Sequence, residues 1–239
     1  MPTVDILAIA AHRDDVELSC GGTLLVAAKN GRTTGIIDLT LGEMGTRGSA
    51  DLRGEEASRA AAVLGVAARE NLGLPDGGVL NTPETRAKLA VAIRRFAPRV
   101  VIAPSIQGKH PDHTVSAQLI RDACFVAGLM RVEPDVPPHR PKKLIHTIAY
   151  REDAPKPTFV VDITDVFEQK MEAIRCYGSQ FDEAIQAGEV FPNGEPLYDI
   201  IRHQAAHYGS LIRTRYGEPF FTPETMRFDD VGALEVASF

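Results

Sequence analysis

Cysteine is scarce in this chain, and the few cysteines show no paired spacing. The three residues, Cys20, Cys124 and Cys176, are odd in number and form no C-x-x-C motif. This pattern argues against a disulfide framework of the kind that small secreted domains use, and it favours a reducing cytosolic environment. We therefore expect the three cysteines to be buried as small apolar side chains.

The sequence also lacks a long apolar run and an excess of basic residues. No apolar stretch approaches the roughly 20 residues that a membrane-spanning helix needs. The first residues carry no basic segment, and their apolar run is interrupted at Asp5 and ends at His12, which predicts a buried strand and not a signal peptide. The net charge of −6 argues against general nucleic-acid binding. We expect a cytoplasmic protein with a small-molecule partner.

The overall composition is that of an ordinary globular protein. The chain has 239 residues, of which 44% are hydrophobic and 24% charged. This length is sufficient to bury one large core. The sequence contains no internal repeat, low-complexity tract or clear linker, so we expect residues 1–239 to form a single domain.

Strand-like and helix-like segments alternate along most of the chain. Short apolar runs predict strands at 4–10, 34–39, 69–73, 100–103, 144–150 and 159–161. Helical periodicity and capping residues predict helices at 17–30, 52–64, 83–96, 113–128, 165–177 and 198–210. Residues 41–50, 133–143 and 182–196 are predicted to be loops. This alternation is typical of an α/β, Rossmann-like domain with a mostly parallel sheet flanked by helices.

Two polar motifs follow predicted buried strands. His12-Arg13-Asp14-Asp15 comes after strand 4–10, and His110-Pro111-Asp112-His113 comes shortly after strand 100–103. Parallel α/β sheets bind ligands beyond the carboxyl ends of their strands. We therefore expect the two motifs to meet in space at this edge of the sheet.

The residue types in these motifs suit a catalytic metal ion. Such an ion usually takes three protein ligands and keeps one position for water, and His12, Asp15 and His113 can provide that set. His12 and Asp15 lie three residues apart on a predicted turn, so both side chains can face one point. Zn²⁺ is the expected ion, although the same ligands also suit Fe²⁺, Co²⁺ or Mn²⁺.

The remaining motif residues can carry out acid–base chemistry. Asp14 would be free to act as the general base that takes a proton from an attacking water. His110 can stabilise a developing oxyanion or protonate a leaving amine, and Asp112 can orient a histidine. A simpler interpretation is that Asp14 or Asp15 only caps the helix that follows, because acidic residues after a strand often do so. Each motif alone is a weak signal, and the pair is much stronger.

The two motifs resemble the signatures of a known enzyme family. Ala11-His12-Arg13-Asp14-Asp15-Val16-Glu17 resembles the Ala-His-Pro-Asp-Asp-x-Glu signature of the LmbE-like (PIG-L) N-deacetylases, and His110-Pro111-Asp112-His113 matches that family's second signature. Length and motif order most resemble the bacillithiol-biosynthesis branch, which deacetylates N-acetylglucosaminyl-malate. Further segments similar to the family lie at 38–48, 53–57, 71–77 and 177–181.

This resemblance implies both a fold and a set of roles. The implied fold is Rossmann-like, with additional C-terminal strands and helices. The implied site is a zinc ion held by His12, Asp15 and His113, with Asp14 as the base and His110 near the oxyanion. The resemblance also implies a sugar conjugate as the small-molecule substrate and a homo-oligomer, commonly a hexamer.

Other residues near the motifs are candidates for binding substrate or supporting the ligands. The resemblance implies that Arg53 grips sugar hydroxyls. Arg47 and Lys109 lie in adjoining loops and are cations suited to an acidic aglycone. Glu17 and Asp112 are expected to support the metal ligands without binding the ion.

The sequence departs from the family pattern at two positions. Arg13 stands where proline is typical, and Lys109 stands where arginine often precedes the second motif. Arg13 loses the fixed φ of proline and is expected to place a cation beside the Asp14 and Asp15 carboxylates, which favours their ionised forms. Lys109 keeps the positive charge but not the bidentate fork of arginine.

Two alternative functions remain open from the sequence. One is deacetylation of a different N-acetylglucosamine conjugate, and the other is a metal-free, nucleotide-binding Rossmann-like module. The glycines at 21–22 and 42–48 form no G-x-G-x-x-G or P-loop at the first turn, which argues against the module. His203 and His207 have the i, i+4 spacing of helical zinc sites, but Gln204 stands where a zincin needs glutamate, so we expect surface residues.

Overall fold

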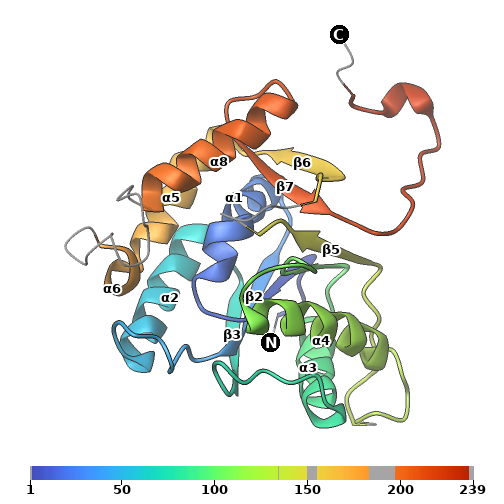
Figure 1. Cartoon of the computed structure of the whole chain (residues 1–239). Coiled ribbons are helices and arrows are strands. Elements are labelled where there is room, and N and C mark those ends of the chain that lie inside the picture. The colour runs from blue at the N-terminus through green and yellow to red at the C-terminus, as the bar shows by residue number, and fades with distance from the viewer. Residues whose placement is uncertain (1, 134, 150–154, 183–196, 237–239) are drawn as a thin grey trace.

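The computed structural model describes residues 2–133, 135–149, 155–182 and 197–236. They form an α/β fold around a seven-stranded sheet of order β3-β2-β1-β4-β5-β7-β6 (Figure 1). The strands are β1 (Ile6–Ala10), β2 (Thr34–Thr40), β3 (Ala68–Leu74), β4 (Val100–Ala103), β5 (Lys143–Thr147), β6 (Phe159–Asp162) and β7 (Gly217–Phe221). The helices are α1 (Asp15–Lys29), α2 (Ala50–Leu64), α3 (Pro83–Phe96), α4 (Pro111–Ala127), α5 (Phe167–Arg175), α6 (Gly178–Phe181) and α8 (Leu197–Leu211), with 3₁₀ turns at Thr164–Val166 and Val231–Ala233.

The sheet is mostly parallel, as the alternation of elements predicted. Strands β1 to β5 pair in parallel, with β1 between β2 and β4. β7 runs antiparallel to both β5 and β6 and completes the C-terminal edge of the sheet. The predicted fold class, including the additional C-terminal strands, is therefore confirmed.

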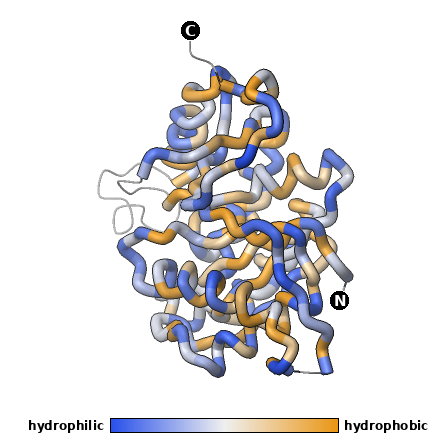
Figure 2. Tube along the Cα trace, turned by 90° about the vertical axis from the view of Figure 1, so that its right-hand side faces the viewer, coloured by the Kyte–Doolittle hydropathy of each residue, from blue (hydrophilic) through white to orange (hydrophobic). Residues whose placement is uncertain are grey.

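Helices cover both faces of the sheet and divide the core in two. Along β1, Leu7 and Ile9 pack with α3 and α4, whereas Ala8 and Ala10 face the cluster formed with α1, α5 and α8. This two-sided burial explains why β1 is apolar at every position. Figure 2 shows polar and apolar residues intermixed along the helices, as expected of helices that bury one face.

Strand β7 was not predicted from the sequence. Its segment Gly217–Phe221 contains a glycine, a glutamate and a proline, which are rare in strand interiors. The β5 pairing ends at Phe220, so β7 has a neighbouring strand on only one side at Pro219, where a proline without an N–H is tolerated. Glu218 is tolerated because it has a buried cationic partner.

That partner is Lys170, and the Lys170–Glu218 pair makes hydrogen bonds with backbone groups of α1. Lys170 Nζ lies 2.5 Å from a Glu218 carboxylate oxygen and donates to the Leu18 carbonyl at 2.9 Å. The carboxylate accepts from the backbone N–H groups of Gly22 at 2.8 Å and Thr23 at 2.6 Å. A regular α-helix would pair the Gly22 N–H with the Leu18 carbonyl. The ion pair thus joins α5 and β7 to α1 one turn beyond the first polar motif.

Other expectations have mixed outcomes. Cys20 and Cys124 are buried as predicted, whereas Cys176 is only partly buried. His203 and His207 are exposed on α8. Within the described ranges, no helix has both the length and the apolar character to span a membrane. The predicted loop at 182–196 falls, apart from Asp182, outside the described residues.

Candidate functional site

The fold brings the two polar motifs together beyond the carboxyl ends of β1 and β4. The first motif forms the turn between β1 and α1, and His110 occupies the N-cap position of α4. The ring of His12 lies 4.8 Å from that of His110 and 5.2 Å from that of His113, measured between centroids. The two motifs therefore meet at this edge of the sheet, as their positions after β1 and β4 led us to expect.

Three side-chain atoms from these motifs form a nearly equilateral triangle. His12 Nδ1 lies 3.2 Å from His113 Nε2 and 3.3 Å from Asp15 Oδ2, and the third side, from His113 Nε2 to Asp15 Oδ2, is 3.2 Å. A tetrahedral zinc ion with bonds of about 2.0–2.1 Å needs ligand atoms roughly 3.3–3.4 Å apart. The spacing and chemistry of this triangle therefore fit a divalent metal ion.

A second possible metal-binding group, formed by His12, His110 and Asp112, overlaps the first. Its donor atoms already have other partners. His110 Nδ1 accepts from the backbone N–H of Asp112 at 3.2 Å, and the Asp112 carboxylate accepts from the backbone of Gly77 at 2.7 Å and Val79 at 3.3 Å. In the triangle that includes Asp15 and His113, all three distances between donor atoms are 3.2–3.3 Å, which matches the spacing of zinc ligands.

The far side of the His12 ring faces two carboxylates. His12 Nε2 lies 3.0 Å from Asp76 Oδ1 and 3.5 Å from Asp112 Oδ2. Asp76 is held in turn by the backbone N–H of Met44, which donates to its second oxygen at 2.9 Å. A carboxylate on the remote nitrogen of a metal-binding histidine fixes the ring and its tautomer. Sequence reasoning assigned no role to Asp76, although its place after β3 was an available signal.

Charge in the group favours a bound cation. Burial alone lowers the pKa of His12, but the carboxylates of Asp15, Asp14 and Asp76 outweigh burial and raise it to about 9. The Asp15 carboxylate raises the pKa of His113, and both histidines hold the pKa of Asp15 well below its usual range despite its burial. The three carboxylates thus favour positive charge on the two histidine rings, and the same negative charge would favour a bound cation.

Asp14 lies beside the triangle and is paired with an arginine. Its Oδ2 atom is 3.0 Å from Arg53 Nη2, and Arg53 Nη1 donates to the Gly42 carbonyl at 3.3 Å. Both side chains are largely buried. Asp14 occupies the N-cap position of α1 but makes no side-chain capping bond, and the Asp15 carboxylate accepts from the backbone of His12 instead. The simple capping interpretation of these acids is therefore wrong.

The other predicted substrate cations lie further out. The Arg47 guanidinium donates to the Gln180 carbonyl at 3.4 Å, and Gln180 returns a bond to the Arg47 carbonyl at 2.9 Å. Lys109 is exposed and lines a cavity beside the metal-binding group. Arg53 is thus a predicted substrate residue that contacts Asp14, and Lys109 is one that lines the cavity.

Arg13 is turned toward the start of α2. Its guanidinium donates to the Ala50 carbonyl, and burial lowers its pKa. The carboxylate that acts on it most strongly is Asp38, and not either of the two motif carboxylates. Arg13 thus places a cation near the first motif as expected, but the carboxylate with the strongest effect on it is Asp38 in β2.

Glu17 contacts two residues that also hold the first motif in place. It is fully buried, it pairs with Arg69 Nη1 at 2.6 Å, and it accepts from the Tyr177 hydroxyl at 3.1 Å. Burial raises its pKa to about 7. Arg69 and Tyr177 both also donate to the Arg13 carbonyl. These donors hold the turn that carries His12 and Asp15. Arg69 was not identified from the sequence.

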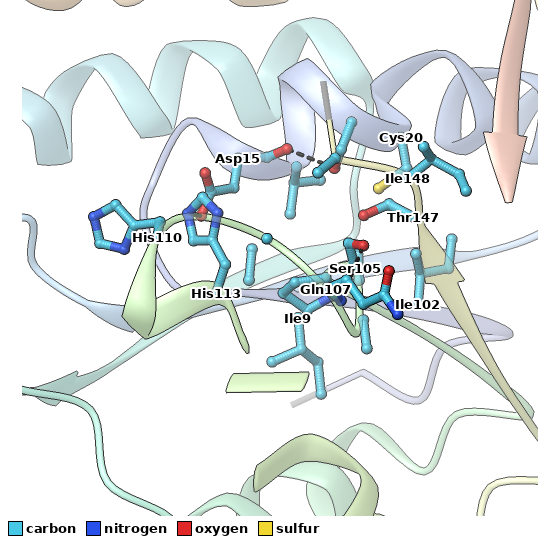
Figure 3. Close-up of a pocket in the computed structure, with 18 of the residues that line it drawn as sticks. Ile9, Asp15, Cys20, Ile102, Ser105, Gln107, His110, His113, Thr147 and Ile148 are labelled. Carbon is cyan, nitrogen blue, oxygen red and sulfur yellow. Dashed lines mark hydrogen bonds and ion pairs between the residues drawn. The ribbon is translucent and has the colours of Figure 1, made fainter. Parts of the chain in front are cut away.

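A cavity of about 460 Å³ opens beside the metal-binding group (Figure 3). Asp15, His110 and His113 form one end of its wall, and the carboxyl ends of β1, β4 and β5 form much of the rest. A pocket of this size next to a metal-binding triangle and a carboxylate is suited to hydrolysis of a bound small molecule.

Comparisons with known proteins agree with this geometry. The family model PIG-L, described as GlcNAc-PI de-N-acetylase, matches residues 7–124, which include both motifs. The diacetylchitobiose deacetylase of Thermococcus kodakarensis is 31% identical over 229 residues, covering 89% of this chain and 80% of that protein. The 4-oxalmesaconate hydratase of Pseudomonas putida is 27% identical over 203 residues, covering 75% of each, so similar proteins do not all carry deacetylase names.

A solved structure extends the similarity over nearly the whole chain. The crystal structure of a conserved protein from Thermus thermophilus superposes with a TM-score of 0.84 at 38% identity, covering 95% of this chain and 97% of that one. The family model spans every residue of the metal-binding triangle. The chain therefore belongs to the PIG-L (LmbE-like) deacetylase family.

Proposed function

We propose that the protein is a metal-dependent hydrolase that removes the N-acetyl group from a glucosaminide, and specifically from N-acetylglucosaminyl-malate. The observation that carries the proposal is the triangle of His12, Asp15 and His113 with Asp14 beside it. These three residues would hold Zn²⁺, or alternatively Fe²⁺, Co²⁺ or Mn²⁺. A divalent ion bound there supplies Lewis acidity and lowers the pKa of bound water toward about 7.

Asp14 is the residue we assign as general base. Arg53 pairs with its Oδ2 atom at 3.0 Å, which fixes the carboxylate and leaves Oδ1 to accept a proton from the attacking water. Arg53 would therefore orient the base as well as contact sugar hydroxyls. Arg47 and Lys109 would contact the acidic aglycone, which is what favours a malate conjugate over a neutral one.

His110 is assigned to the developing oxyanion. Its Nδ1 atom accepts from the backbone N–H of Asp112, so a neutral ring carries its hydrogen on Nε2. Burial and the neighbouring histidines lower the pKa of His110, which favours this neutral form. A neutral Nε2–H can donate to the amide oxygen as negative charge develops there. This tautomer supports oxyanion stabilisation over protonation of the leaving amine.

The proposal is tested by measuring acetate release from a substrate panel. The Zn²⁺-loaded protein is expected to hydrolyse N-acetylglucosaminyl-malate faster than N,N′-diacetylchitobiose or free N-acetylglucosamine. A chelator should reduce this activity to background, and added Zn²⁺ should restore it. Faster turnover of another N-acetylglucosamine conjugate would replace the malate assignment. Hydration of 4-oxalmesaconate without acetate release, or nucleotide binding without bindable metal, would contradict the deacetylase proposal.

Asp76 provides a second prediction, because it holds the remote nitrogen of His12. Asp76→Asn should weaken Zn²⁺ binding by about 10- to 100-fold, since the amide orients the imidazole without the carboxylate's charge. Competition with a chromophoric chelator measures this affinity directly. Asp135→Asn, at an exposed position, is the matched control and should leave the affinity unchanged. Wild-type affinity in the Asp76 variant would show that the contact does not support the metal site.

We further propose a single domain over residues 1–239 that acts in the cytoplasm as a homo-oligomer, commonly a hexamer. The free cysteines suit a reducing compartment. The oligomer rests on resemblance to the family. Light scattering of the purified protein tests it, and a monomer at micromolar concentration would contradict it.

A further inference from the structure

We propose that the cavity beside the metal-binding group is an acyl pocket, and that the protein removes aliphatic N-acyl groups longer than acetyl from glucosaminides. The inference rests on the proposed function, because it names the class of acyl group that the same hydrolytic site accepts.

The cavity leads away from the metal-binding group into the fold. One end is formed by His110 and His113, and the other by Cys20, Thr147 and Ile148 (Figure 3). Cys20 comes from α1, and the other two residues come from the end of β5 and the position after it. The space between these ends is therefore reached directly from the atoms that would hold the reacting amide.

The walls between the two ends are mainly aliphatic. Residues from β1, α1 and β4 line them, and of these Ala8, Ala10, Val16 and Ile102 belong to the core cluster on the α1 side of the sheet. Among the described residues of the wall, the ionisable groups at the motif end are Asp15, Lys109, His110 and His113, which are at or next to the two polar motifs. The end at Cys20 therefore offers no charged partner to a polar ligand.

Two hydroxyl groups in the described wall have backbone partners. The Ser19 hydroxyl donates to the Asp15 carbonyl at 2.6 Å, and the Ser105 hydroxyl accepts from the Gln107 N–H at 3.4 Å. Burial raises the pKa of the Cys20 thiol, so this group stays neutral. A sugar ring would find no charged partner at this end, whereas an alkyl chain would bury its apolar surface there.

The size of the cavity points in the same direction. Its volume of about 460 Å³ falls in the range of roughly 300–1,000 Å³ typical of pockets that enclose a whole small molecule. The methyl group of an acetyl is a single carbon and would occupy a small part of it. A chain of several methylene groups would fill the space and bury its apolar surface.

The position of the cavity separates the two substituents of the scissile amide. Asp15 and His113 belong both to the triangle and to the wall of the cavity. Asp14 and Arg53 are not among the described residues that line this wall. An amide held at the triangle can therefore direct its sugar toward Arg53, the residue implied to grip sugar hydroxyls. Its acyl chain then extends toward Cys20.

The reaction is the same hydrolysis with a longer acyl group. Water adds its oxygen to the amide carbonyl carbon, the C–N bond breaks, and the leaving nitrogen gains the proton that the base removed. The products are a carboxylate, R–COO⁻, and the ammonium form of the glucosaminide, R′–NH₃⁺, from R–CO–NH–R′ and one water. No oxidant or further reactant is needed.

Acyl length is varied on one sugar to test the inference. The Zn²⁺-loaded wild-type protein is assayed for amine release from N-acetyl-, N-butanoyl-, N-hexanoyl- and N-octanoylglucosamine. We expect kcat/KM for hexanoyl to exceed that for acetyl by at least about tenfold, because each buried methylene contributes roughly fourfold. Turnover of the acetyl substrate with a hexanoyl kcat/KM less than about tenfold higher would overturn the acyl pocket and leave the proposed function intact. Absence of turnover for every member and for N-acetylglucosaminyl-malate would overturn the proposed function itself.

Variants that fill the Cys20 end of the cavity test whether the acyl chain of the substrate lies there. Cys20→Leu should lower the hexanoyl-to-acetyl ratio of kcat/KM at least about tenfold, and Ile148→Phe should do the same if the first variant does not fold. Cys124→Leu enlarges a buried cysteine in the core under α3 and α4, and it should keep the wild-type ratio. A wild-type ratio in both cavity variants would overturn the assignment. So would a preference for longer alkyl aglycones on N-acetyl substrates without any preference for acyl length.

Discussion

Asp14→Ala is expected to lower kcat for deacetylation by about 10²- to 10⁴-fold while Zn²⁺ remains bound. The variant removes the carboxylate that would take the proton from the attacking water. It keeps the triangle of His12, Asp15 and His113, whose donor atoms are 3.2–3.3 Å apart. Initial rates of acetate release, together with zinc content from elemental analysis, measure the two effects separately.

Asp14→Asn sharpens this experiment. The amide is close to the carboxylate in size and can still contact Arg53, but it cannot accept a proton from water at neutral pH. Its kcat should therefore fall nearly as far as that of the alanine variant. Asp51→Asn, at an exposed position in the first turn of α2, is the control and should match the wild type. Full activity in Asp14→Asn would remove Asp14 from the role of base.

The second large effect concerns stability and the Lys170–Glu218 ion pair that joins α5 and β7 to α1. Lys170→Met is expected to lower the free energy of unfolding by about 3–5 kcal/mol, because it leaves the Glu218 carboxylate buried and without its cation. Both residues are only 2% exposed. For a chain of this length, that loss corresponds to a fall in Tm of roughly 6–20 °C. Thermal unfolding followed by circular dichroism measures it.

Two comparisons isolate the cause. Arg227→Met breaks an exposed pair with Asp229 and should change the free energy of unfolding by at most about 1 kcal/mol. The double variant Lys170→Met/Glu218→Leu removes both charges and should recover part of the loss. The recovery is partial because the backbone N–H groups of Gly22 and Thr23 then lose their acceptor. A Lys170→Met protein as stable as the wild type would contradict this account.

Much of the fold, and the meeting of His12, Asp15 and His113 at one point, could be predicted from the sequence. The apolar runs of β1 and β4 are buried on both faces, so local composition alone marks them. The triangle could be predicted because its residues lie in two short motifs, each placed shortly after such a strand. Parallel pairing then brings the motifs to one edge, whatever the detailed packing.

The residues that support the triangle could not be predicted in the same way. Asp76 acts through a contact with His12 across 64 positions of sequence, and its loop is held by Asp112. Arg69 is a buried arginine in a strand at the edge of the sheet, and its pairing with Glu17 depends on three-dimensional packing. Such side chains have no local periodicity, and their roles appear only when distant segments pack together.

β7 was missed for a related physical reason. Strand prediction relies on alternating apolar and polar residues, and the segment has Glu218 at a buried position and Pro219 beside it. The glutamate is acceptable only because Lys170 and the N–H groups of α1 surround it. The partner that makes this sequence a strand lies 48 residues earlier in the chain.

The bond between Gly22 and Glu218 also has a consequence for the order of folding. It spans 196 positions of sequence, and the bond between Arg13 and Tyr177 spans 164. Contacts between such distant segments form late, because closing a long loop costs entropy before the contact stabilises it. During synthesis, the first helix would emerge from the ribosome long before the strand that completes its hydrogen bonding. We therefore expect metal-binding competence to appear only after nearly the whole chain has been made.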